Sequence, residues 1–399
     1  MSVVYLDENA TAALSSGAIH AMTAWLSAPP ANASSVHQWG RRARGAIEQS
    51  RRQIAQSLAV SPRHLTFTSG ATEALHTVIC GVLSAGDHVV VSAVEHPATW
   101  GALRHVGASV DVVPVNHKGQ IDPDDFKACL KPHTKLGVMM AAQNEVGVIY
   151  PTYEVAQRLG EVPLLVDAAQ AYGKTQLKLE DTGATYAVVS GHKMGGPLGV
   201  GALWCRGGEP FDPLLMGGAQ ERGRRAGTEN VPAIVGFGAA ANEVKERLEA
   251  LRNTRNLRDQ LRDQLRDIDG VSILGGWADL DHLKSDLEDE INQDSDDVLS
   301  ESWRGWRTHH QLPNTLYLSI PRLEGDLLLQ HLDLQGYCVS SGSACSSGAL
   351  DPSSTLLALG FDAHHARRGL RISMSPYTTD AELEGFVTCL RMLCDQSSL

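Results

Sequence analysis

Lys193 is the first residue of this sequence whose position suggests covalent chemistry. It stands in TYAVVSGHKMGG, residues 185–196, where an apolar, β-branched run ends abruptly in small and polar residues. Such a run predicts a buried strand, and open α/β sheets place their chemistry at the carboxyl ends of their strands. A lysine there can form a Schiff base with a carbonyl compound when a partly desolvated site frees its amine. The alternative, commoner for a single lysine, is a solvated side chain that caps the strand.

Asp167 is predicted to be a buried carboxylate, because it closes the apolar run Leu164-Leu165-Val166-Asp167. A carboxylate at the end of such a strand costs free energy unless a cation or a hydrogen-bond donor meets it. The protonated ring nitrogen of pyridoxal phosphate is such a partner, and the contact would keep the ring an electron sink. Asp167 and Lys193 end consecutive strand-like runs, so one ring could contact both.

A phosphate site is expected at Thr68-Ser69-Gly70-Ala71-Thr72-Glu73, which follows a predicted strand and opens a helix predicted over residues 74–83. Small residues at the start of a helix leave backbone N–H groups exposed at the positive end of its dipole. Thr72 could add a hydroxyl donor. The alternative is an ordinary junction, since strand-to-helix turns need a glycine or a capping residue in any case.

Two further polar residues follow apolar strands, and a third lies inside one. His96 follows the strand predicted over residues 88–94, and Asn144 follows the strand predicted over residues 135–141. A histidine in this position can stack on a flat cofactor or move protons, although a single histidine is more often structural. Arg371 lies inside the apolar run Leu370-Arg371-Ile372, where a buried charge requires a partner.

Cys345 is the cysteine that we expect to be reactive. It lies in VSSGSACSSG, residues 339–348, among small and polar residues where a thiol can move and be reached. The alternative is a small apolar residue in a Gly/Ser-rich loop, and that interpretation holds for the other six cysteines, which lie in apolar or helical contexts. The seven cysteines lack the paired spacing of a disulfide framework or a zinc site, so no metal site is predicted.

The elements that position these residues alternate between strand and helix from His64 onward, which predicts an α/β fold with a mostly parallel sheet. Long helices are predicted over residues 40–58 and, as one helix or a pair, over residues 239–268. In the first of them Arg41, Arg44, Arg51 and Arg52 are expected to face solvent. Seven strands are predicted in one sheet, at residues 65–68, 88–94, 109–113, 135–141, 163–166, 186–189 and 201–204.

Two domains are expected. The large cofactor-binding domain spans residues 14–252, and a smaller α+β domain spans residues 253–399, with strands at 314–320 and 370–374 and with residues 1–13 packed against it. Residues 277–310 are interpreted as an acidic surface insertion, because ten acids and one lysine stand between Asp279 and Glu301. Its alternative role is docking to a basic partner.

Composition excludes several classes of protein. A formal net charge of −12 argues against a nucleic-acid partner, which needs a concentrated basic face. No apolar run approaches the roughly 20 residues that cross a bilayer, and the first residues do not resemble a signal peptide. We therefore expect a soluble protein of the reducing cytoplasm.

Four motifs taken together resemble those of the class V aminotransferase superfamily, whose members use pyridoxal phosphate and share fold type I. The resemblance is closest to the cysteine desulfurases and runs from Tyr5 to about Thr379. The form Ser-Ser-Gly-Ser-Ala-Cys at residues 340–345 is similar to the branch that serves iron–sulfur cluster assembly or nitrogen fixation. The four motifs are Ser69-Gly70-Ala71-Thr72-Glu73, Asp167-Ala168-Ala169-Gln170, Ser190-Gly191-His192-Lys193 and Arg225-Ala226-Gly227-Thr228.

The resemblance implies a homodimer that converts L-cysteine to L-alanine and passes the sulfur to Cys345 as a persulfide. Lys193 would carry the cofactor, Asp167 would face its ring nitrogen, and Gln170 would bind its phenolic oxygen. His96 would stack on the ring and is a candidate proton acceptor. Cys345 could also be a transient iron–sulfur ligand. The phosphate would be held by Ala71, Thr72, Ser190 and His192 together with Thr228 of the partner subunit, and the substrate by Asn144 and Arg371.

Rival functions remain open from the sequence. A selenocysteine lyase, an aminotransferase or a kynureninase would share the fold, but the Cys345 loop argues against the last two. A different class of protein is a sulfur-transfer scaffold without strong catalysis, which would dock partners through the acidic insertion. Two departures from the family pattern favour it, Leu198 and Ser375-Pro376. The acceptor of the sulfur, an iron–sulfur scaffold or another protein, is not identified by the sequence.

Overall fold

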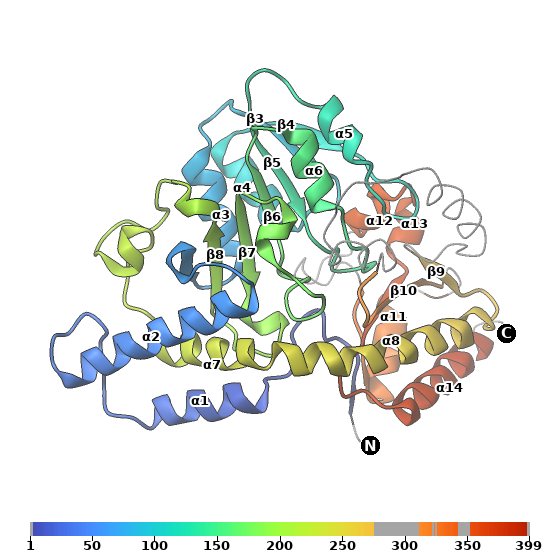
Figure 1. The fold of residues 1–399 in the computed structure, drawn as a ribbon. Helices are drawn as coiled ribbons and strands as arrows, with labels where there is room; N and C mark the ends of the chain where they lie inside the picture. The colour runs from blue at the N-terminus through green and yellow to red at the C-terminus, as the bar shows by residue number, and fades with distance from the viewer. Residues whose placement is uncertain (1–2, 275–310, 321–322, 324, 342–351, 397–399) are drawn as a thin grey trace, which may run out of the picture.

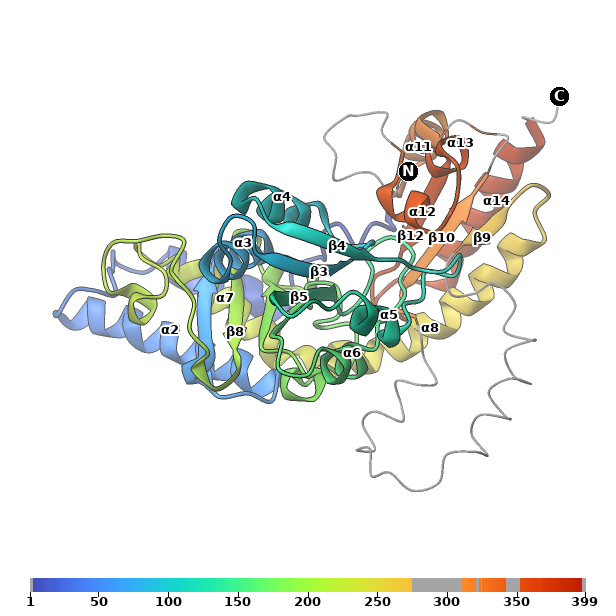
Figure 2. The same cartoon turned by 90° about the horizontal axis from the view of Figure 1, so that it is seen from above.

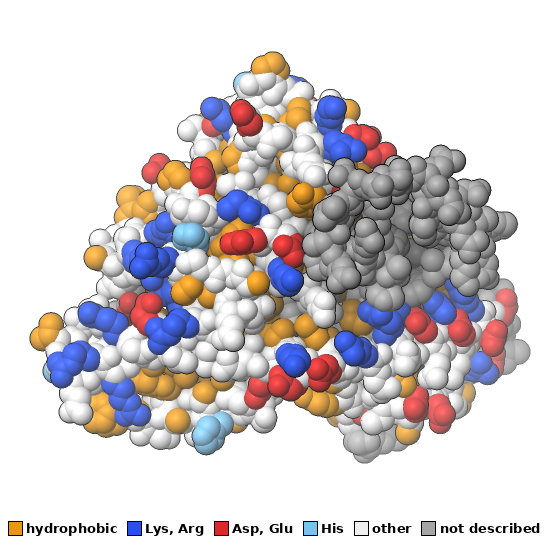
Figure 3. All heavy atoms as spheres, in the orientation of Figure 1, with side chains coloured by type: hydrophobic (Ala, Val, Ile, Leu, Met, Phe, Trp, Pro, Cys, Tyr) orange, Lys and Arg blue, Asp and Glu red, His pale blue; other side chains and the backbone are white. Residues whose placement is uncertain are grey.

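The computed structural model describes residues 3–274, 311–320, 323, 325–341 and 352–396 (Figure 1). Two features expected from the sequence therefore lie outside the described residues, Cys345 with the residues around it from 342 to 351 and the whole acidic insertion at 277–310. Among the described residues, no helix combines the length and the apolar character that crossing a membrane requires. On the face shown in Figure 3, acidic and basic side chains are interspersed. The cytoplasmic location stays a prediction.

The large sheet has seven strands in the order β2-β8-β7-β6-β5-β3-β4. Neighbouring strands are parallel except at β8, which runs antiparallel to both β7 and β2. The predicted mostly parallel, seven-stranded α/β sheet is confirmed. Its strands are β2 (Leu65–Thr68), β3 (His88–Ser92), β4 (Ser109–Val113), β5 (Thr134–Met140), β6 (Leu164–Asp167), β7 (Tyr186–Ser190) and β8 (Gly201–Cys205).

Helices cover both faces of this sheet (Figures 1 and 2). Val89 and Val91 of β3 belong to the cluster with α3 and α4, whereas Val90 between them belongs to the cluster on the other face. Alternate residues of a strand point to opposite faces, so a strand covered on both sides needs a continuous apolar run. The helices here are α1 (Ser16–Leu26), α2 (Gln38–Ser57), α3 (Ala71–Val82), α4 (Pro97–Val106), α5 (Pro123–Ala128), α6 (Thr152–Leu159) and α7 (Val231–Asn242).

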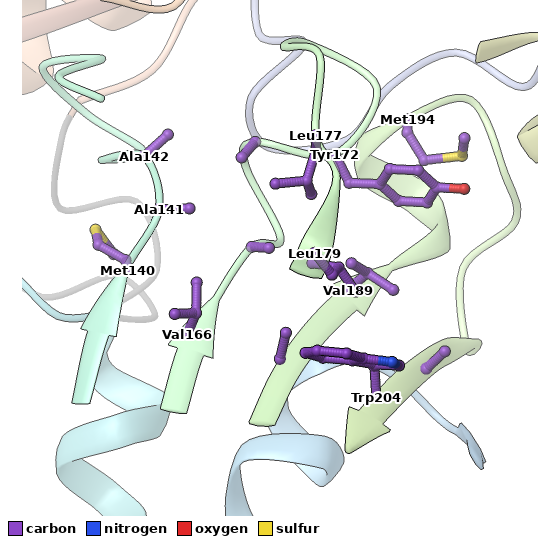
Figure 4. Close-up of a cluster of buried hydrophobic side chains, with 14 of the residues drawn as sticks. Met140, Ala141, Ala142, Val166, Tyr172, Leu177, Leu179, Val189, Met194 and Trp204 are labelled. Atoms are coloured by element: carbon purple, nitrogen blue, oxygen red, sulfur yellow. The ribbon is translucent and has the colours of Figure 1, made fainter. Parts of the chain in front are cut away.

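Figure 4 shows part of the hydrophobic core that packs against one face of the large sheet. Trp204 of β8 and Val189 of β7 lie in one buried cluster with Tyr172 and Leu179, which follow β6 in the chain. Met194, directly after Lys193, belongs to the same cluster. The segments that carry site residues are therefore anchored by apolar side chains.

Two helix boundaries differ from the sequence expectation. α3 begins at Ala71, three residues before the predicted start, so the phosphate loop is already part of the helix. The helix predicted from residue 239 begins at Val231, where the Asn230 side chain caps the backbone N–H of Ala233 at 3.2 Å, and it breaks near Asn242 before α8 (Val244–Arg266). The second of the two predicted forms, a helix pair, is correct.

The expectation that Arg51 faces solvent is wrong. Arg51 is buried, and its two terminal nitrogens donate to the two carboxylate oxygens of Glu221 at 2.7 Å each. The backbone N–H of Phe67 also donates to Glu221 at 2.7 Å. Arg41, Arg44 and Arg52 are exposed as expected.

A second sheet, antiparallel and ordered β12-β10-β9, lies beside α8, α11 and α14 (Figure 1). Leu6, after β1, belongs to the hydrophobic core of this part. The expected boundary at residue 252 falls inside α8, and the two-domain division stays a prediction. The remaining elements are β1 (Val4–Tyr5), β9 (Ser272–Leu274), β10 (Thr315–Ser319), α11 (Gly325–Leu334), β11 (Tyr337–Cys338), α12 (Ser354–Ala358), α13 (Ala363–Ala366), β12 (Gly369–Ser373) and α14 (Asp380–Gln396).

Candidate active site

A cavity of about 400 Å³ lies where the carboxyl ends of β5, β6 and β7 face the start of α3. This is the place where open α/β sheets bind ligands. Thr228 is exposed and does not line this cavity, and Cys345 lies outside the described residues. The structure brings together all the other predicted site residues, namely Ala71, Thr72, His96, Asn144, Asp167, Gln170, Ser190, His192, Lys193 and Arg371.

Lys193 is half-buried in a short 3-10 turn, Gly191–Lys193, directly after β7. Its Nζ donates a hydrogen bond of 2.5 Å to the backbone carbonyl of Asn9. The turn is tight, because the Gly191 carbonyl accepts from the backbone N–H groups of Met194 and Gly196. A Cβ on Gly196 would lie 2.9 Å from the Gly191 oxygen, so only glycine fits there. The backbone thus fixes where the lysine side chain starts.

Asp167 is the last residue of β6, and β6 pairs in parallel with β7. Its carboxylate is buried and accepts one hydrogen bond, from the backbone N–H of Ala169 at 2.9 Å. Burial raises its pKa, and the Ala169 N–H and the nearby His96 and Lys193 reduce that shift. A cation placed in the cavity would favour the ionised carboxylate further.

The start of α3 can bind an anion. Its N-cap residue, Gly70, has no side chain to accept from the N–H groups of the first turn. Ser69 and Glu73 brace the loop, since the Ser69 N–H donates to Glu73 at 2.8 Å and Arg225 donates to Glu73 at 2.9 Å. Burial opposes ionisation of Glu73, but the hydrogen bonds from Arg225 and Ser69 outweigh it and lower its pKa. Glu73 therefore holds the loop, and the Arg225 cation offsets the carboxylate charge that would otherwise repel an anion at the start of α3.

His192 is held neutral. Burial, followed by the positive charges of Lys193 and Lys174, lowers its pKa to about 4. Its Nδ1 lies 3.2 Å from the Thr11 hydroxyl. A neutral ring has one N–H to donate, which suits a phosphate oxygen.

His96 has a defined tautomer. It is the N-cap residue of α4, and its Nδ1 accepts a hydrogen bond of 3.1 Å from the backbone N–H of Ala98. A backbone N–H can only donate, so the neutral ring carries its proton on Nε2. The side chain therefore has a donor to offer the cavity that it lines.

Arg371 has the partner that its buried position requires. It lies in β12 and donates to Asp7 Oδ1 at 2.7 Å and to the Asn144 backbone carbonyl at 3.0 Å. Its Nε is buried and has no hydrogen-bond partner within the described part of the chain. Two of the five guanidinium N–H groups are thus used in these contacts, and Nε is among those that could donate to another acceptor, such as a carboxylate.

Sequence reasoning missed Asn9 and Lys174. The Asn9 backbone carbonyl accepts from both Lys193 and Gln170, the latter at 2.9 Å, and Asn9 lines the cavity. Lys174 is buried behind it. The signal for Asn9 is the polar break after the first strand, whereas Lys174 follows a helical-looking turn and has no local signal.

The described residues contain one group of side chains that could ligate a metal, Asp362, His364 and His365. Asp362 Oδ1 already accepts from the His365 backbone N–H at 2.8 Å and contacts its ring nitrogen at 2.8 Å. Capping of α13 accounts for this arrangement without an ion.

Known proteins resemble this chain over nearly all of its length. Residues 4–283 match the family model for class V aminotransferases. A cysteine desulfurase from Nostoc sp. is 36% identical over 393 residues, which cover 96% of this chain and 91% of that protein. A solved NifS-like protein has a TM-score of 0.84 at 30% identity, covering 99% of this chain and 100% of the other. SspA in complex with cysteine has a TM-score of 0.70 at 27% identity, covering 94% and 99%.

The chain belongs to the class V aminotransferase family. The family resemblance stated from the four sequence motifs is confirmed. Class V aminotransferases are pyridoxal phosphate enzymes, and this chain is an enzyme of that type.

The cavity fits the cofactor of the class V family in its donor set. Asp167, a buried carboxylate, ends β6, and Lys193, a partly buried amine, lies in the turn that follows the neighbouring strand β7. The start of α3, where no side chain caps the first N–H groups, lines the same cavity. These are the groups that an aldehyde, a ring cation and a phosphate require.

Proposed function

We propose that this enzyme is a cysteine desulfurase, which removes sulfur from L-cysteine and releases L-alanine. One observation carries the proposal: Lys193, Asp167 and Arg371, three charged residues from distant parts of the chain, line a single cavity. The Nostoc relative bears this activity in its name, and the SspA structure holds cysteine.

Pyridoxal phosphate would be held by Lys193 through its carbonyl, by Asp167 at its ring nitrogen and by Gln170 at its phenolic oxygen. Bound there, it would supply an electron sink for breaking bonds to the carbon atoms of the amino acid. The phosphate would lie at the start of α3, against Ala71 and Thr72, with Ser190 and His192 completing the site.

The substrate carboxylate would bind Arg371, beside Asn144. The two terminal nitrogens of Arg371 already donate to Asp7 and to the Asn144 carbonyl. Its buried Nε has no hydrogen-bond partner within the described residues. Asp7 fixes the plane of the guanidinium, so the side chain is oriented before the substrate arrives.

Protons would be moved by Lys193 and His96. Once its amine is no longer bonded to the cofactor, Lys193 would take the proton from the substrate Cα. We propose a donor role for His96, because its Nδ1 is occupied by the Ala98 N–H and its proton is on Nε2. This replaces the acceptor role expected from the sequence.

The sulfur would pass to Cys345. Its thiolate would attack the substrate sulfur, the Cβ–S bond would break, and the electron pair would go to the carbon, which takes up a proton as L-alanine forms. The product on the enzyme is a persulfide, and an iron–sulfur scaffold or another sulfur acceptor would receive it. The acidic insertion is a candidate docking segment for that acceptor.

We further propose a homodimer in which Thr228 of the partner subunit completes the phosphate site. Thr228 is exposed, yet its loop is fixed at two points, by Arg225 on Glu73 and by Glu221 on Arg51. Met216, in the same loop, is 85% exposed, and Leu198, at the cavity, is 67% exposed. Burial of these two side chains against a partner subunit would remove apolar surface from water.

The experiment is an assay of purified enzyme with pyridoxal phosphate, L-cysteine and a thiol reductant, measuring alanine and sulfide. Cys345→Ala should lose both products while keeping the visible absorbance of the bound cofactor, and Lys193→Ala should lose that absorbance. Cys338→Ala, on the neighbouring strand β11, is the matched control and should keep full activity. Normal turnover by Cys345→Ala would contradict the proposed role.

A further inference from the structure

Lys174 is a buried lysine behind the wall of the active-site cavity. Its side chain is almost completely removed from solvent, with 2% relative exposure, and it is not a cavity-lining residue. Its Nζ donates to the Asn9 side-chain oxygen at 2.7 Å and makes a very short hydrogen bond to Gln170 Oε1. Burying a lysine costs free energy, so these two contacts require an explanation.

The contact fixes which way the Gln170 carboxamide faces. A lysine nitrogen placed this way donates, so the amide atom next to it must be the oxygen. Gln170 Nε2 then lies on the other side, where it donates to the Asn9 carbonyl at 2.9 Å. The amide nitrogen has two N–H groups, and the second is available to the cavity that Gln170 lines.

The backbone around Lys174 is held from two sides. Arg247 donates to the Gly173 carbonyl at 3.0 Å and to Glu8 at 2.9 Å. Gly173 has φ +75°, and a Cβ there would lie 2.5 Å from the Cβ of Met194, the residue after Lys193. The lysine therefore starts from a rigid turn packed against the Lys193 segment.

The geometry does not depend on the charge of Lys174. Burial is the main cause that lowers the pKa of Lys174 well below the usual range, and the nearby charges of Lys193 and Arg247 lower it further. Arg371 adds to this shift, whereas Glu8 opposes it. A neutral amine still has two N–H groups, enough for both acceptors. Both hydrogen bonds therefore persist in either protonation state.

We propose that Lys174 is a positioning residue that holds the Gln170 carboxamide with its N–H toward the cofactor's phenolic oxygen. The proposal rests on the proposed function, because it assumes that pyridoxal phosphate binds in this cavity. Without Lys174, Gln170 Oε1 would lose this buried donor, and the carboxamide would be oriented less firmly, by the hydrogen bond from Nε2 to the Asn9 carbonyl.

The test is a pH titration of the visible absorbance of the holoenzyme. An N–H donated to the phenolic oxygen stabilises its ionised form, so losing that donor raises the midpoint pH of the absorbance change. Gln170→Ala and Lys174→Met should each raise it by about 0.5 to 1 pH unit, the loss of one hydrogen bond. The double variant should show no further rise, because Lys174 acts through Gln170.

Lys178→Met, four residues along the same segment and exposed, is the matched control and should leave the midpoint unchanged. If Lys174→Met does not fold, Lys174→Gln, which cannot reach both acceptors, should show a smaller rise in the same direction. An unchanged midpoint in a folded Lys174 variant, or shifts that add in the double variant, would overturn the inference. Absence of the absorbance band in the wild-type protein would instead overturn the proposed function.

Discussion

Glu95, one residue before His96, is expected to be uncharged at neutral pH. Its side chain is buried, Oε1 accepts from the Ser92 hydroxyl and from the Met140 N–H at 2.6 Å each, and Oε2 has no hydrogen-bond partner within the described residues. Burial raises the pKa of Glu95 to about 8, the charge of Asp167 adds to the shift, and the hydrogen bonds from Ser92 and Met140 reduce it. Glu95→Gln replaces this neutral acid with a neutral amide of the same shape.

The size of the stability change follows from the difference between the Glu95 pKa of about 8 in the folded enzyme and 4.5 in the unfolded chain. Between these values the folded enzyme keeps a proton that the unfolded chain has released, so its free energy of unfolding falls as the pH rises. The contribution is fully present below pH 4.5 and is lost as the pH rises through 8. The whole loss is about 5 kcal/mol, or at most about 1.4 kcal/mol for each pH unit.

Thermal melts of wild type and Glu95→Gln between pH 5 and 9 measure this effect. The melting temperature of Glu95→Gln should rise relative to wild type as the pH increases, because the amide has no proton to lose. Glu249→Gln, an exposed acid on α8, is the control and should follow the wild-type curve. Parallel curves for Glu95→Gln and wild type would refute the reasoning, since they would mean that Glu95 titrates alike in both states.

Two other substitutions have expected outcomes. Glu221→Gln leaves the Arg51 guanidinium buried with only a neutral partner and should destabilise the enzyme by about 3 kcal/mol. A melting temperature equal to that of wild type would show that this ion pair does not hold the loop that carries Glu221 and Thr228. Arg371→Lys removes the planar fork that Asp7 orients and should raise KM for L-cysteine about tenfold or more, with a smaller change in kcat. Steady-state alanine assays measure both constants, and an unchanged KM would remove Arg371 from substrate binding.

The sheet could be predicted because most of its strands are buried on both faces and so appear as continuous apolar runs; the partly exposed β4 is the exception. The site followed from it, since Asp167, Lys193 and His96 stand at or just beyond strand ends, and parallel strands bring those ends to one edge. The first residues of the helices could be predicted less accurately than the strands. Ala71 and Val231 open their helices before the apolar pattern begins, at glycine and asparagine caps.

What the sequence could not predict depends on contacts between distant segments. Arg51 has helical surface spacing, but its carboxylate partner comes 170 residues later. Asp7 and Arg371 are 364 residues apart. Lys174 has no local signal because its two acceptors belong to the site and to the first strand's end. Such pairs become visible only when the fold places them together.

A single turnover tests the central claim most directly. Holoenzyme without reductant is mixed with one equivalent of L-cysteine, and both L-alanine and the mass of the peptide containing Cys345 are measured. The account predicts one alanine per subunit and one added sulfur atom on that peptide. Alanine without the added sulfur, or a cofactor-loaded enzyme that forms no alanine, would contradict it.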